Sequence, residues 1–111
     1  MSPNALDDFL GPLKARYIIQ LRERRVELTD FIEVCAQATL DEEIQQDMRK
    51  KIHRLAGSAA TYGFPWISNA ARILETAIDA QMDAPKLLEL TQALLLECDR
   101  AIGSSSADKA Q

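Results

Sequence analysis

The sequence predicts an all-α fold, an antiparallel up-and-down four-helix bundle with a short extra helix or turn at its N-terminus. Apolar residues recur at steps of three and four along nearly all of the 111 residues, which is the period of a helix face. No stretch alternates between apolar and polar residues for long enough to form a strand. The links between the periodic segments are short, and most contain proline or glycine. We therefore assign residues 1–103 to one helical domain and residues 104–111 to a flexible, polar C-terminal tail.

The N-terminal part of the chain is divided by a Gly-Pro pair. Residues 1–10 are expected to form a short first turn, and Gly11-Pro12 is expected to break it, because proline suits the first position of a new helix. The new helix is predicted to run to about Gln37. Arg24 interrupts its apolar stripe, and we interpret it as an arginine whose stem lies at the bundle edge while its head reaches water. The stripe consists of Leu13, Tyr17, Leu21, Leu28, Phe31, Ile32 and Cys35.

The second predicted helix has clear signals at both ends. Either Thr39 or Asp41 can cap its acidic first turn, with Glu42 as the capping-box partner of Thr39. Gly63 is predicted to end it, because glycine readily takes the left-handed conformation that stops a helix. Its apolar stripe consists of Ile44, Met48, Ile52, Leu55, Ala59 and Tyr62.

The third helix is predicted to run from Trp66 to Gln81, after Pro65 restarts the chain. Phe64 and Trp66 are interpreted as side chains that pack in the core or at the hinge before this helix. The residues expected to face inward are Ile67, Ala70, Ala71, Leu74, Ala77 and Ile78.

The fourth helix is predicted to begin at Pro85 and to end at Gly103. Its stripe consists of Leu88, Thr91, Leu94, Leu95, Cys98 and Ile102. Cys35 and Cys98 each fall on an apolar stripe, so we expect two buried free thiols and no disulfide. Two isolated cysteines and one histidine show no metal-ligand spacing, so no metal site is expected.

The composition argues against several classes of protein. The net charge is −4, whereas a nucleic-acid-binding protein needs a basic surface. No apolar run approaches the length of a membrane span, and no basic and apolar leader opens the sequence. We therefore expect a cytoplasmic domain that binds neither nucleic acid nor membrane.

The one histidine of the chain lies on the polar side of the second helix. At 100° per residue, His53 falls about 145° from the middle of the apolar stripe and is expected to face water. Positions three, four and seven residues away are its neighbours on the helix surface. On the N-terminal side these are Gln46, Arg49 and Lys50, so this edge of the ring is basic.

On the C-terminal side the neighbours of the histidine are small, namely Ala56, Gly57 and Ala60. A glycine inside a helix costs about 1 kcal/mol relative to alanine. A single exposed histidine is most often plain solvated surface. The basic edge and the flat surface together indicate instead that another molecule comes close to His53.

The residues in this region follow the pattern His53-x-Leu55-x-Gly57-Ser58-Ala59-x-x-x-Gly63, and Leu74-Glu75 follows on the third helix. This pattern resembles the signature of histidine-containing phosphotransfer (HPt) domains, which act in two-component phosphorelays. The motif covers about a quarter of the chain, and chain length and helix number fit the family over almost all of it. The chain departs from the family at Ala56, where a lysine is common.

The resemblance implies a phosphocarrier and not an enzyme. His53 would accept a phosphoryl group from the aspartate of one receiver domain and pass it to another. The partners implied are receiver domains of a hybrid sensor kinase and of a response regulator, and the protein is expected to be monomeric. No glycine-rich phosphate loop and no carboxylate cluster for Mg²⁺ accompanies the histidine, so no cofactor is expected here and Mg²⁺ is expected in the receiver.

The supporting residues are assigned as follows. Arg49, Lys50 and Arg54 would offset the charge of the phosphoryl group. Ala56, Gly57 and Ala60 would admit the loops of the partner. Glu75 is the leading candidate to hold the second ring nitrogen, with Arg72 and Asn69 as alternative contacts.

Two other functions fit a helical bundle. A non-catalytic adaptor or dimerisation bundle would not need His53 at all. The phosphoacceptor region of a sensor kinase is also helical, but it typically has an acidic residue directly after the histidine and a proline soon afterwards. Arg54 and Gly57-Ser58 stand at those positions, which disfavours this reading.

Overall fold

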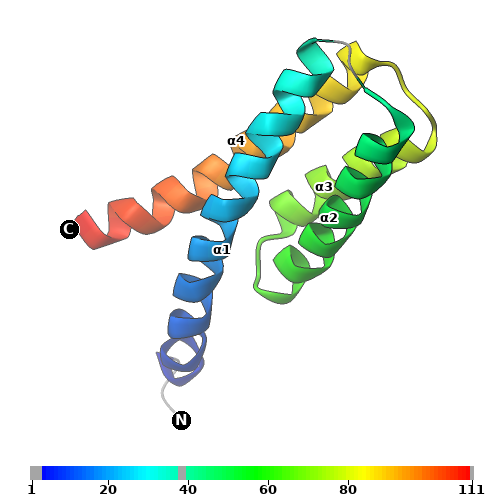
Figure 1. Cartoon of the computed structure of the whole chain (residues 1–111). Helices are drawn as coiled ribbons and strands as arrows, with labels where there is room; N and C mark the ends of the chain where they lie inside the picture. The colour runs from blue at the N-terminus through cyan, green and yellow to red at the C-terminus, as the bar shows by residue number, and fades with distance from the viewer. Residues whose placement is uncertain (1–3, 38–39, 111) are drawn as a thin grey trace.

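The computed structural model describes residues 4–37 and 40–110, and the side chains of residues 11–37 and 40–103. It contains the helices α1 (Asn4–Ala36), α2 (Glu42–Thr61), α3 (Pro65–Asp79) and α4 (Ala84–Ala110). Successive helices run in opposite directions (Figure 1), and the described residues contain no strand. The predicted all-α, up-and-down four-helix bundle is therefore confirmed.

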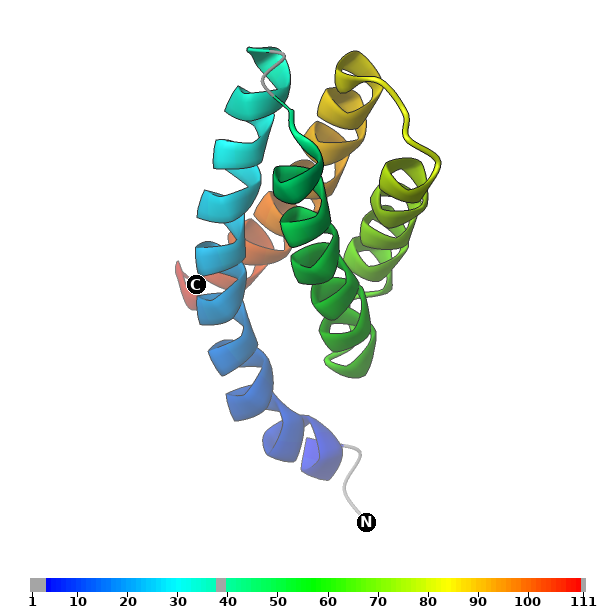
Figure 2. The ribbon, with the colours of Figure 1, turned by 45° about the vertical axis from the view of Figure 1, so that its right-hand side comes forward.

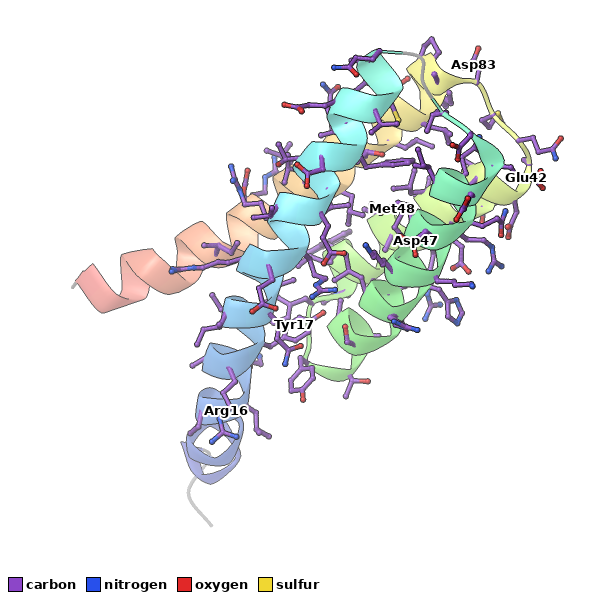
Figure 3. The ribbon with its side chains drawn as sticks, viewed as in Figure 1. Arg16, Tyr17, Glu42, Asp47, Met48 and Asp83 are labelled. Atoms are coloured by element: carbon purple, nitrogen blue, oxygen red, sulfur yellow. The ribbon has the colours of Figure 1, made fainter. Side chains whose placement is uncertain are left out.

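The helices are arranged as two closely packed pairs. α2 packs against α3, α1 packs against α4, and the most extensive contact between the two pairs is that of α3 with α4. The backbones of α1 and α2 lie further apart, which Figures 1 and 2 both show. A groove of about 520 Å³ lies in this gap, with Phe31 and Met48 among its lining residues. Figure 3 shows Met48 on the side of α2 that faces α1.

The core is made of the apolar stripes that all four helices turn inward. Its largest fully buried side chains are Tyr17, Phe31, Leu21, Ile52, Ile67, Leu74, Ile78, Leu87 and Leu94. Cys35 and Cys98 are buried free thiols, as expected. Arg24 is partly exposed at the edge of the core and pairs with Glu27 at 2.8 Å. No described helix has the length and apolarity needed to cross a membrane.

The predicted break at Gly11-Pro12 is wrong, because α1 continues through it and Pro12 lies inside the helix. The first turn is thus the N-terminal end of α1 and not a separate element. The fixed φ of proline is compatible with a helix. Proline lacks a backbone N–H, so one helical hydrogen bond is lost, and its ring crowds the carbonyl one turn earlier. In a helix of 33 residues, the backbone hydrogen bonds before and after Pro12 remain and hold the helix together. Figure 2 shows the axis of α1 bending toward this end.

The predicted end of the fourth helix at Gly103 is also wrong. α4 continues to Ala110, so residues 104–110 are helical and do not form an irregular tail. Among the described glycines only Gly63 has a positive φ. Gly103 therefore keeps a helical backbone, and a single glycine of this kind weakens a helix by about 1 kcal/mol without stopping it.

Both ends of α2 follow the local rules read from the sequence. The Asp41 side chain caps the first turn by accepting a hydrogen bond from the Ile44 N–H at 2.7 Å. The other candidate cap, Thr39, lies outside the described residues. Gly63 has φ +85°, and its N–H and that of the next residue donate to carbonyls of the last turn, at 3.3 and 2.8 Å. This is the Schellman arrangement, and it ends α2 at Thr61.

α3 ends earlier than predicted, at Asp79. Gln81 takes φ +58° there and makes a Schellman turn like the one at Gly63. The expected packing of Trp66 is wrong, since 73% of this residue is exposed. Its neighbour Ile67 points into the core, and adjacent helical positions are 100° apart. Phe64 is partly buried and stacks on Tyr17, as a hinge residue should.

Candidate functional site

His53 lies in the middle of α2 with 70% of its side chain exposed. The buried residues of this helix are Met48, Ile52, Leu55, Ala56 and Ala59, and of these only Ala56 lies on the same side of the helix as His53. The outward orientation predicted from the helical period is confirmed. A rigid helix thus presents the imidazole ring to solvent.

One ring nitrogen of His53 is held by α3. Nδ1 lies 2.8 Å from Oε2 of Glu75, whose side chain is only 14% exposed. An ionised carboxylate can only accept a hydrogen bond, so this contact favours the tautomer with its proton on Nδ1. The other nitrogen, Nε2, then carries a lone pair. The expected contact between Glu75 and the ring is therefore present.

Arg49 lies one turn before His53 and bridges two carboxylates of α3. Its Nε and Nη2 contact Asp79 at 2.5 and 3.2 Å, and Nη2 lies 3.4 Å from Glu75 Oε2. The hydrogen bond to Asp79 raises the pKa of Arg49, and the same bond lowers the pKa of Asp79. The sequence predicts that Arg49 offsets the charge of a phosphoryl group, and the structure places its guanidinium between two carboxylates.

The basic residues around the histidine therefore divide into two groups. Lys51 is engaged like Arg49, in its case by Glu27 at 3.1 Å and by Asp47 at 3.4 Å. Lys50, Arg54 and Arg72 are exposed, and within the described residues they form no ion pair; these three are called the free cations below. Arg72 precedes Glu75 by three residues, which makes the two neighbours on the surface of α3.

The small residues after His53 do not all lie on its surface. Gly57 and Ala60 are exposed, and a Cβ atom added to Gly57 would meet no atom within 4 Å apart from those of its adjoining residues and the nearby backbone of its own helix. The expectation that Ala56 belongs to this flat surface is wrong, because only 3% of it is exposed. Its carbonyl accepts a hydrogen bond from Ser68 Oγ of α3 at 2.8 Å. α2 is covered by α3 as well as by the core, so its buried arc is wider than one apolar stripe.

Comparison with known families assigns most of the chain to one family. The Hpt domain model matches residues 20–103, which is 84 of the 111 residues and includes His53 and Glu75. The chain belongs to the Hpt domain family. Comparisons with curated proteins and with solved structures find no match. Hpt domains are phosphocarriers that act through a histidine in phosphorelays and interact with receiver domains.

Within this Hpt domain, a polar contact fastens the C-terminal half of α2 to α1. The hydroxyl groups of Tyr17 and Ser58 lie 2.7 Å apart, and the Tyr17 ring stacks on Tyr62 with centroids 4.7 Å apart. Burial raises the pKa of Tyr17, so its hydroxyl stays protonated and available for this bond. Figure 3 shows Tyr17 on the side of α1 that faces α2. Ser58 thus takes part in the packing of α2 against α1.

The sequence reasoning missed Asp79. A signal was present in the spacing, because Arg49 and His53 are four residues apart, as are Glu75 and Asp79. In an antiparallel pair of helices such spacings match turn for turn. The sequence did not reveal which turn of α3 faces which turn of α2. Within the described part of the chain, no group of three potential metal ligands accompanies the site.

Proposed function

We propose that His53 accepts a phosphoryl group on Nε2 from the aspartyl phosphate of one receiver domain and passes it to the aspartate of a second. The observation that carries this proposal is the exposed imidazole whose Nδ1 is engaged by Glu75. The engaged nitrogen keeps the proton, and the lone pair is left on the nitrogen that a partner can reach.

The transfer needs no base. Nε2 forms a bond to phosphorus with its lone pair while the bond from phosphorus to the aspartyl oxygen breaks, and that oxygen leaves with the electron pair as a carboxylate. The proton on Nδ1 stays in place, so the phosphorylated ring carries a positive charge. The Glu75 carboxylate, 2.8 Å away, stabilises that charge. The reverse reaction, with the aspartate of the second receiver as the nucleophile, releases the group.

The free cations Lys50, Arg54 and Arg72 would offset the negative charge of the phosphoryl group. All three are exposed, Lys50 and Arg54 on the same helix as His53 and Arg72 on α3 one turn from Glu75, and none is tied to a carboxylate of the described chain. Each contributes little alone, about 0–1 kcal/mol at an exposed position. Phosphoryl transfer depends on positioning and charge stabilisation, so the remaining elements, Mg²⁺ among them, would come from the receiver.

Gly57 and Ala60 would let the loops of the receiver approach the ring. A longer side chain at either position would stand between the imidazole and the partner, because both lie within two turns of His53 on the exposed side of α2. Nothing in the packing of the bundle calls for a glycine at position 57, since no atom lies near the place of its missing Cβ.

A transfer experiment tests the proposal. Wild-type protein and His53→Gln are each incubated with a receiver domain that carries labelled aspartyl phosphate, and then with an excess of a second, unlabelled receiver. We expect label on the wild type that is lost in acid, survives in alkali, and moves to the second receiver. The His53→Gln variant should stay unlabelled, and its circular dichroism should show an intact helical fold, because residue 53 is exposed.

Two outcomes contradict the proposal. Label on His53→Gln would show that another residue is the acceptor. A wild type that stays unlabelled while it still binds receivers would favour a non-catalytic adaptor bundle.

A further inference from the structure

We propose that Arg49 and Asp79 form a positioning pair, which holds the Glu75 carboxylate and through it sets the tautomer and orientation of His53. This inference rests on the proposed function, because it assigns a role in the same transfer. It gives Arg49 a task different from that of the free cations. It also adds Asp79 to the functional site, although this residue lies seven positions after Arg72, the free cation of α3.

The first argument is the register of the two helices. α2 and α3 are antiparallel, so Arg49 stands opposite Asp79 and His53 stands opposite Glu75, one turn further along. Arg49 Nη2 reaches across this register to Glu75 Oε2, the same oxygen that faces His53 Nδ1. The four side chains therefore form one continuous chain of contacts.

The second argument concerns charge. Glu75 and Asp79 are like charges four residues apart on one helix, which destabilises a helix unless a cation lies between them. The guanidinium of Arg49 lies there, at 2.5 Å from Asp79 and 3.4 Å from Glu75. A glutamate has three rotatable bonds, and its carboxylate can also turn outward to water. Attraction to Arg49 favours the rotamer in which Oε2 meets the imidazole.

The third argument is that Arg49 is poorly placed to bind the phosphoryl group itself. Its Nε and Nη2 point at Asp79, in the two-point geometry typical of arginine with a carboxylate. If the guanidinium of Arg49 turned toward His53 Nε2, it would lose both of its hydrogen bonds to Asp79. Lys50, Arg54 and Arg72 face no such loss, because no ion pair holds them in the described chain.

The test uses three variants and a matched control. Asp79→Asn removes the anchor of Arg49, Arg49→Gln removes its charge, and Arg49→Lys keeps the charge but not the two-point geometry. The control is Asp99→Asn, which breaks another exposed Arg–Asp pair, between α1 and α4, where Arg25 Nε lies 2.5 Å from Asp99 Oδ1. Neither residue of the control pair lies at the site.

The first measurement is the tautomer of His53 in the unphosphorylated protein, read from long-range proton–nitrogen correlations of its imidazole at alkaline pH. We expect the wild type and Asp99→Asn to hold the proton on Nδ1. In Asp79→Asn, Arg49→Gln and Arg49→Lys, the ratio of the two tautomers should shift toward Nε2–H by about threefold. An unchanged ratio in Asp79→Asn would overturn the proposal. This readout needs no receiver, so it stands even if the transfer hypothesis fails.

The second measurement is the rate of phosphoryl transfer. We expect the three variants at the pair to be slowed by roughly tenfold relative to Asp99→Asn, as for a nucleophile that is slightly misplaced. Arg49→Lys at the wild-type rate, with Arg49→Gln slowed, would mean that Arg49 acts only by its charge, and would overturn the proposal. Thermal unfolding of all four variants shows whether a slow rate is merely lost stability.

Discussion

The two glycines of the α2 region, Gly57 and Gly63, are six residues apart and have opposite explanations. Gly63 has φ +85° and makes the turn that ends the helix, and an added Cβ would come within 3.3 Å of Lys14 Nζ. Gly57 is helical, and an added Cβ would meet nothing within 4 Å. The turn after α2 needs Gly63, whereas Gly57 weakens the helix. No packing constraint of the described bundle requires a glycine at position 57.

The same contrast separates the two sides of α2. Leu55 is 4% exposed and belongs to the core, whereas His53, two residues earlier, is open to solvent. Substitutions on the first side should change the stability of the bundle, and substitutions on the second should change transfer. The predictions that follow test this division, beginning with the largest effect.

Leu55→Asp should unfold the protein, because it removes a buried apolar side chain and places an unpaired charge in the core. We expect a loss of at least about 4 kcal/mol of unfolding free energy. Arg54→Asp, at the adjacent exposed position, should stay within about 0.5 kcal/mol of wild type and serves as the control. Urea and thermal unfolding, followed by circular dichroism, measure both. A cooperative transition of Leu55→Asp near the wild-type midpoint would show that this face of α2 is not in the core.

Substitution of each glycine by alanine should change stability in opposite directions. Gly63→Ala should lose about 1–2 kcal/mol, because an L side chain is strained at a positive φ. Gly57→Ala should gain up to about 1 kcal/mol from helix propensity, with no clash to offset it. The unfolding free energies of both variants and of the wild type are measured by urea unfolding under identical conditions. Effects of the same sign would remove the contrast between the two positions.

Gly57→Gln should slow phosphoryl transfer while the helix stays intact. The added side chain extends over the exposed surface one turn from His53 and would obstruct a docking receiver. We expect a reduction of at least about tenfold, which corresponds to about 1.4 kcal/mol in the barrier. Transfer rates and unfolding curves are compared with those of Gly57→Ala. An unchanged rate would mean that the flat surface plays no part in docking.

The link between α2 and α3 should weaken in acid. Arg49 lowers the pKa of Asp79, so the stabilisation that this pair provides is present above the carboxyl's ordinary pKa and is lost as the pH falls through the lowered one. Between about pH 4 and pH 2, wild-type protein should therefore lose slightly more stability than Asp79→Asn. Unfolding curves at several pH values measure the difference. Parallel pH profiles for the two proteins would contradict a stabilising pair.

Most local features of this protein could be predicted from the sequence. The period of the apolar residues identified four helices and turned His53 outward, because both follow from the 100° step of a single helix. The left-handed turn at Gly63 and the cap at Asp41 depend on a few neighbouring residues. The helix boundaries at Pro12 and Gly103 were wrong, since a proline or glycine weakens a long helix without having to end it.

The sequence by itself determined the outward histidine, the small residue beside it and the carboxylate on the next helix. Only the tertiary structure decided that Ala56 is covered by α3 and that Trp66 is exposed. It also decided that Arg49 is held between Glu75 and Asp79. The reason is that the helical period establishes which side of each helix is apolar, whereas the register and the rotation of one helix against another arise from packing between segments that are distant in the chain.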